Sequence, residues 1–119
     1  MPYIHKPQLY RDVIDALVSS CRSGQGQTGS DRARKGLWNQ NATAESMPDQ
    51  HRFNELLARL PQKDRDVIAE MLAKEYVGGA FAALSVLNDF EVAPFESGYE
   101  GAAYNDFVGR LDNWSWPAK

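Results

Sequence analysis

The segment that most constrains the fold is residues 60–90, LPQKDRDVIAEMLAKEYVGGAFAALSVLNDF, because it is the longest periodic run in the chain. In its first half, large apolar side chains recur at the one-and-four spacing of an amphipathic helix. From residue 80 onward the apolar residues leave almost no polar face, so we expect this part to be buried on more than one side. The segment is therefore the predicted centre of the core.

Two adjacent glycines, Gly78 and Gly79, stand between these two halves. Glycine in a helix interior costs about 1 kcal/mol relative to alanine, so the pair needs a compensating reason. One alternative is a turn between two helices, and the other is close approach of a neighbouring helix. Ala82 and Ala83 each follow one glycine by four residues, which makes a strip of small residues on one helix face. The partner of this strip is either the same chain or a second copy.

Three shorter segments also show helical periodicity. Residues 9–21 form the clearest amphipathic helix, and residues 53–60 and 102–111 carry shorter apolar stripes. Cys21 continues the first stripe, so we expect a buried, inert thiol. His51 and Asn54 lie one helical turn apart beside the second stripe, where such a polar pair is expected to satisfy a neighbouring backbone group.

The polar segment of residues 23–46 is rich in Gly, Ser, Gln and Asn, and its only bulky apolar residues are Leu37 and Trp38. Such a composition predicts a flexible loop, with these two side chains anchoring it to the core. An alternative is a mobile loop that closes over an anionic ligand through its cations, Arg32, Arg34 and Lys35.

The C-terminal part is rich in aromatic residues, with seven of the thirteen in the chain at residue 90 or beyond. So much apolar area predicts that this tail docks on the core. The alternative is an exposed aromatic surface or a ligand pocket. Its lining would be Tyr99, Tyr104, Trp114 and Trp116, with a convergent acid from Glu96, Glu100, Asp106 or Asp112.

Composition excludes several classes of function. A net charge of −3 does not suit a nucleic-acid partner, and the longest uncharged apolar run, residues 76–87, is shorter than the ~20 residues that span a membrane. The one cysteine cannot form an internal disulfide, and the N-terminus has no signal-peptide core, so we expect a cytoplasmic protein. Because His5, His51 and Cys21 are scattered, we expect no metal site and no cofactor.

Several of these features together resemble a known group of proteins. They are the helix of residues 9–18, the His51-x-x-Asn54-x-Leu-Leu-x-x-Leu60 helix, the Gly78-Gly79 pair, and the closing DFVGRLDNWSWP of residues 106–117. In this combination the chain resembles small bacterial proteins that are grouped as a domain of unknown function. The resemblance implies an all-α fold in the bacterial cytoplasm and assigns no activity or functional residue.

We therefore predict a single all-α domain over residues 1–119, with four to five helices in an orthogonal or bundle-like packing and the aromatic tail on the core. The predicted function is a non-catalytic protein-interaction module with a protein partner or a second copy. Its candidate surface is Gly78, Gly79, Ala82, Ala83, Tyr99, Tyr104, Trp114 and Trp116. The alternatives are a small-ligand or enzymatic pocket at the aromatic, acidic C-terminus, and an acidic antitoxin or immunity-type inhibitor with a basic partner.

Overall fold

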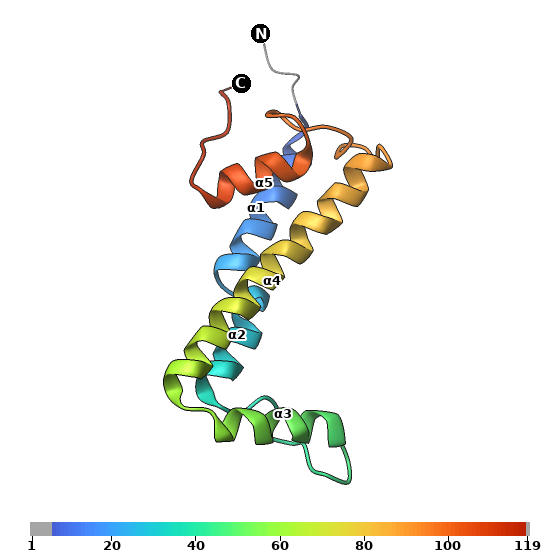
Figure 1. Ribbon diagram of the computed structural model, residues 1–119. Helices are drawn as coiled ribbons and strands as arrows, with labels where there is room; N and C mark the ends of the chain where they lie inside the picture. The colour runs from blue at the N-terminus through green and yellow to red at the C-terminus, as the bar shows by residue number, and fades with distance from the viewer. Residues whose placement is uncertain (1–5, 119) are drawn as a thin grey trace. The chain divides into compact units, whose positions relative to one another are not determined.

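A computed structural model describes residues 6–118 and consists of five helices (Figure 1). They are α1 (Gln8–Arg22), α2 (Gln25–Lys35), α3 (Pro48–Arg59), α4 (Gln62–Asp89) and α5 (Ala103–Leu111). In this part of the chain the only extended pairing is an isolated bridge between Gly98 and Gly101. The predicted all-α fold is confirmed.

Contacts within the chain group the helices into two compact units. The first unit holds α1, the second half of α4, α5 and the C-terminal segment, while the second unit is Ser23–Tyr76, with α2, α3 and the first half of α4. The prediction of one domain over residues 1–119 did not distinguish these two units. Each unit has its own set of buried side chains.

The core of the first unit forms where α1 and α5 pack together. Tyr10, Ile14, Val18 and Cys21 lie on one face of α1 and are all buried, as the stripe predicted. Phe107 of α5 is fully buried. The C-terminal aromatic segment packs on this core, which confirms the predicted docking of the tail.

Helix α2 corrects the expectation of a flexible polar loop at residues 23–46. Its buried residues are Gly26, Ser30 and Ala33, which repeat at helical spacing, and Gly29 lies between them on the same face. A Cβ on Gly29 would meet the ring of Trp38 at 3.4 Å. Small side chains thus let this helix pack closely. The prediction of a loop had been based on the lack of large apolar side chains.

Helix α2 is hydrogen-bonded to α4 near its centre and ends at a glycine. The hydroxyl of Ser30 donates a hydrogen bond of 2.6 Å to the carbonyl of Ala69 in α4, and Gly36 ends α2 in the left-handed conformation at φ 81°. Trp38 then packs against the cluster of Ala33, Leu57 and Ala69. Trp38 is the anchor that the sequence predicted, while Leu37 beside it stays 38% exposed.

Helix α4 corrects two expectations about residues 60–90. It continues through Gly78 and Gly79 without a turn (Figure 1), and nothing lies within 4 Å of a Cβ built on either glycine. The apolar half was expected to be buried on more than one side, yet Leu84 is the one buried residue of 77–89. One face of this half packs on the core and the rest stays open, so apolar composition here did not signal burial.

Candidate interaction surfaces

A fully buried carboxylate, Asp106, organises the polar contacts of the first unit. Its Oδ2 accepts hydrogen bonds from the Tyr10 hydroxyl at 2.6 Å and from the backbone N–H of Tyr99 at 2.7 Å. Its Oδ1 accepts a third bond from the N–H of Glu100 at 2.9 Å. Both oxygens are therefore engaged, and the carboxylate holds α1, α5 and the turn before α5 together.

Close packing at this turn depends on Gly98. A Cβ at this position would lie 2.6 Å from Oδ2 of Asp106 and 2.8 Å from the Tyr10 hydroxyl. The N–H of Gly98 also donates to the carbonyl of Gly101 at 2.6 Å, which closes the turn. A side chain at residue 98 would thus displace the Asp106 carboxylate and the Tyr10 hydroxyl from their hydrogen bond.

Two buried cations complete this cluster. The guanidinium of Arg11, which is 9% exposed, donates to the Tyr99 hydroxyl at 3.0 Å and to the carbonyl of Pro117 at 3.0 Å. The backbone N–H of Lys6 donates to the same hydroxyl, and its ammonium donates to the carbonyl of Pro94 at 2.8 Å. Each charge is thus hydrogen-bonded, as burial requires.

Trp116 connects the C-terminal segment to α1 through a hydrogen bond and ring contacts. Its Nε1–H donates to Oδ2 of Asp15 at 2.9 Å, and the other oxygen of Asp15 pairs with Arg110 at 2.7 Å. The ring centroid of Trp116 lies 6.1 Å from that of Tyr10 and 5.7 Å from that of Tyr99, both in edge-on arrangements. We call Lys6, Tyr10, Arg11, Tyr99, Asp106 and Trp116 the C-terminal cluster.

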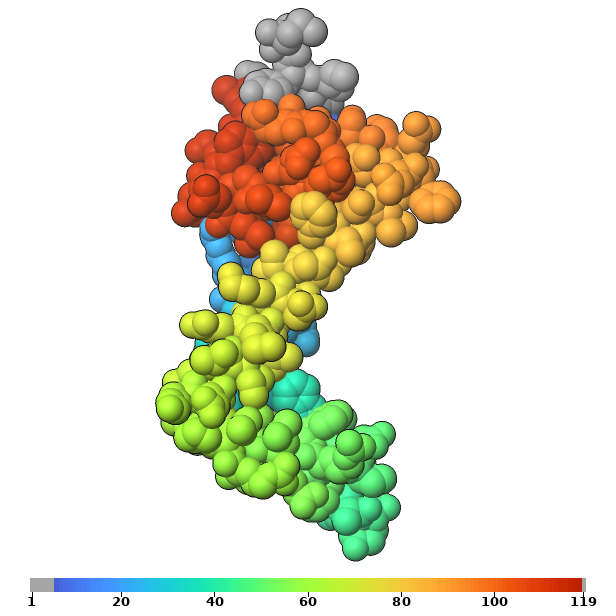
Figure 2. All heavy atoms as spheres, viewed as in Figure 1, coloured from blue at the N-terminus to red at the C-terminus, as the bar shows by residue number. Residues whose placement is uncertain are grey.

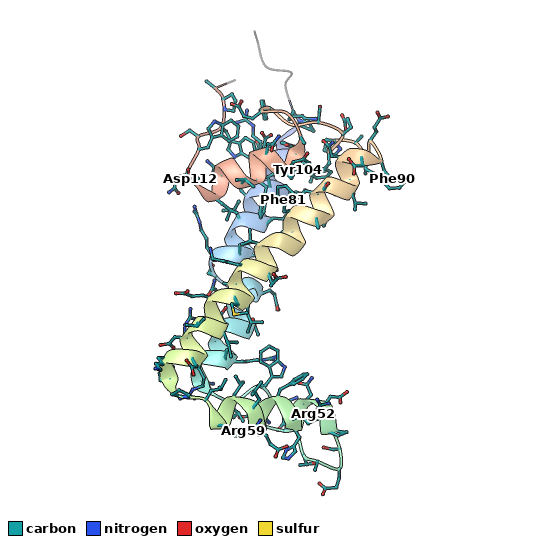
Figure 3. All side chains as sticks on the ribbon, viewed as in Figure 1. Arg52, Arg59, Phe81, Phe90, Tyr104 and Asp112 are labelled. Carbon is teal, nitrogen blue, oxygen red and sulfur yellow. The ribbon has the colours of Figure 1, made fainter. Side chains whose placement is uncertain are left out.

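The structure brings only part of the predicted aromatic surface together. Trp114 lies next to Trp116, which contacts Tyr99. Tyr104 instead pairs with Phe81 of α4 at a centroid distance of 4.5 Å (Figure 3). The aromatic residues thus form two groups. Of the four acids predicted for a pocket, Asp106 contacts the larger group through the Tyr10 hydroxyl and the Tyr99 N–H.

Sequence reasoning missed the polar members of the cluster. Tyr10 was assigned to an apolar stripe, Lys6 and Arg11 were not singled out, and Asp106 was one of four acids considered for a pocket. The partners of Lys6, Tyr10 and Arg11 lie 88 to 106 residues away in the chain. Local spacing carries no signal for such pairings.

The Tyr10 phenol is perturbed by this environment. Burial, together with its hydrogen bond to Asp106, raises the pKa of Tyr10 well above its usual value near 10. At Cys21, burial raises the pKa of the thiol, in keeping with the predicted inert cysteine.

The raised pKa of Tyr10 predicts a loss of stability at high pH. Below pH 10 the phenol is neutral in both states, and above pH 10 the unfolded chain releases this proton while the folded chain keeps it. The free energy of unfolding should therefore fall by up to about 1.4 kcal/mol per pH unit as the pH rises above 10. Tyr10→Phe should reduce this slope in urea titrations between pH 9 and pH 11. Equal slopes in the two proteins would contradict the assignment.

The small-residue strip of α4 is open. Gly78, Gly79, Ala82 and Ala83 are all exposed, and Val86 beyond them is 55% exposed. In Figure 2 the segment after residue 77, coloured yellow to orange, is uncovered on the face shown. We call the four small residues the α4 strip.

The described residues were also considered as a membrane span and as a metal site. No helix between residues 6 and 118 is long and apolar enough to cross a membrane. Within the same residues, no group of three or more His, Cys, Asp or Glu side chains is placed to hold a metal ion, and His5 lies outside the described range.

Comparison with known proteins relates the chain to a family. No curated protein and no solved structure matches the chain at a significant level. A family of unknown function, DUF6547, matches residues 5–118. This match agrees with the predicted resemblance to a domain of unknown function, and because it covers nearly the whole sequence, the chain belongs to that family.

Proposed function

We propose that this protein is a small non-catalytic interaction module that associates with a second copy of itself through the α4 strip. The observation that carries the proposal is the exposure of Gly78, Gly79, Ala82 and Ala83 on a helix whose next large residue, Val86, is also exposed. Contiguous exposed apolar surface is a feature of protein interaction sites.

The shape of the strip suits a helix partner. With no side chain larger than a methyl group at these four positions, a second helix can approach the backbone of α4 closely. The two glycines have nothing within 4 Å of a Cβ, so no contact within the chain requires them. An intermolecular contact supplies the reason for two residues that each cost about 1 kcal/mol in a helix.

Charge favours a second copy at this place. The chain carries a net charge of −3, so two copies have like net charges, which oppose association in general. Between Glu75 and Asp89, however, α4 carries no charged residue. A two-fold dimer needs a patch that is complementary to itself, and a neutral strip of small residues meets this condition. Because the single cysteine cannot form an internal disulfide, we propose that the module works in the reducing cytoplasm.

Analytical ultracentrifugation tests the proposal. The native protein should show a concentration-dependent rise in sedimentation coefficient, and Ala82→Leu should weaken self-association at least tenfold, or about 1.4 kcal/mol. The larger side chain prevents the close approach of the backbones. Ala16→Leu is the matched control, because Ala16 is an exposed alanine on α1. It should associate like the native protein.

Two outcomes would contradict the proposed interface. An unchanged monomer for the native protein up to about 1 mM would remove self-association from the proposal. A dimer that Ala82→Leu and Ala16→Leu affect equally would place the interface elsewhere.

A further inference from the structure

A second apolar surface lies within the Ser23–Tyr76 unit. It is a groove of about 240 Å³ whose walls come from α3, α4 and the segment after α2. The large lining side chains are Trp38, Phe53, Leu56, Leu57, Ile68 and Leu72. Leu57 is buried at its base, while Phe53 and Leu56 remain 42% and 45% exposed.

The groove is held in shape by hydrogen bonds around Trp38. The side-chain oxygen of Asn54 accepts bonds from the N–H of Trp38 at 2.7 Å and of Asn39 at 2.9 Å, and its amide donates to the carbonyl of Asn39 at 2.7 Å. The Trp38 ring then meets Phe53 edge-on at 6.2 Å. A surface with fixed walls loses little conformational entropy when it binds a partner.

Cations line two clefts that each share a wall with the groove. A cleft that shares the Trp38 wall is lined by Arg32 and Lys35, and Arg32 lies 5.4 Å from the centroid of the Trp38 ring.

A second cleft shares Phe53 and Leu56 with the groove. It is lined by Arg52 and Arg59, which both come from α3 (Figure 3), with Glu55 between them. The groove thus adjoins two pairs of basic residues, of which Arg52 also pairs with Asp49 at 3.9 Å. This arrangement favours a ligand whose apolar stripe is bordered by negative charge.

We infer that this groove binds an amphipathic helix of a protein partner, with a stripe of large apolar residues flanked by Asp and Glu. A helix laid into a hydrophobic groove is a recurring mode of peptide recognition. Sites for drug-sized molecules have volumes of about 300–1,000 Å³, so about 240 Å³ suits one or two side chains better than a whole small molecule. A fatty acid has a carboxylate at one end only and leaves one basic pair unmatched.

Fluorescence anisotropy with a designed peptide tests this inference on the full-length chain. The probe is a fluorescein-labelled helical peptide with Leu at positions i, i+3, i+4 and i+7 and Glu on both flanks. A matched peptide carries Lys in place of each Glu. The acidic peptide should bind at least about tenfold more tightly, and the difference should shrink in 0.5 M NaCl. Both titrations are repeated on Ala82→Leu, so that self-association and peptide binding are separated.

Variants locate the site with one control for each. Leu56→Ser and Arg59→Glu should each weaken binding of the acidic peptide at least about fivefold. Met71→Ser is the control for the first, because Met71 is 59% exposed in the same unit and does not line the groove. Arg34→Glu is the control for the second, because Arg34 is exposed and lines none of the three hollows. Both controls should bind like the native protein.

Three results of the peptide titrations would overturn the inference, and a competition experiment gives a fourth. They are no saturable binding up to about 1 mM peptide, equal affinity for the acidic and basic peptides, and equal effects of the groove variants and their controls. Decanoate is added as a competitor, and tighter binding of decanoate than of the acidic peptide would assign the groove to a lipid instead.

Discussion

Asp106→Ala is expected to lower the free energy of unfolding by about 3–5 kcal/mol, because it leaves two buried donors and one part-buried donor without an acceptor. The donors are the Tyr10 hydroxyl and the backbone N–H groups of Tyr99 and Glu100, all within 2.9 Å of the carboxylate. A buried donor that loses its partner costs about 1–3 kcal/mol, and contacts in one network are not additive. Urea denaturation followed by circular dichroism, at one fixed protein concentration, measures the change.

Two further variants separate the hydrogen bonds from other effects. Asp106→Asn keeps the shape and one acceptor oxygen but turns an N–H₂ group toward a backbone donor, so the loss should be about 1–3 kcal/mol. Asp112→Ala removes an exposed acid just after the same helix and should change stability by no more than about 0.5 kcal/mol. Similar small losses in all three variants would show that Asp106 does not hold the unit together.

Large apolar residues at helical spacing explain what could be predicted of the fold. The α1 stripe of Tyr10, Ile14, Val18 and Cys21 is buried as its periodicity indicated. Helix α2 was missed because Gly26, Ser30 and Ala33 carry too little apolar area to show a hydrophobic stripe. Their role is to allow close packing, which depends on what lies opposite them.

Features of the candidate surfaces could be predicted only where residues close in the sequence determine them. Asn54 satisfies backbone groups as its place beside an apolar stripe suggested. The exposure of Ala82 and Ala83 was not predictable, because an apolar segment with few polar residues is more often buried. Tyr104 was grouped with the C-terminal tryptophans by proximity in sequence, whereas its partner Phe81 lies 23 residues earlier on α4.

Trp116→Ala is expected to lower the free energy of unfolding by about 3 kcal/mol, the lower end of the range for removing a packed Trp, because the ring is half-buried. Its ring contacts Tyr10 and Tyr99, and the guanidinium of Arg11 lies 5.4 Å from its centroid. The same urea titration measures the loss. Phe90→Ala is the matched control, since Phe90 is 78% exposed and its removal should cost no more than about 0.5 kcal/mol.

Trp116→Phe divides the effect of the tail into packing and hydrogen bonding. Phenylalanine keeps an aromatic ring against the core but cannot donate to Asp15, so its cost should be about 1 kcal/mol. If Trp116→Ala and Trp116→Phe destabilise equally, the N–H bond to α1 rather than ring packing holds the tail. If neither variant is destabilised, the aromatic tail does not stabilise the core, and its surface is free to bind a partner.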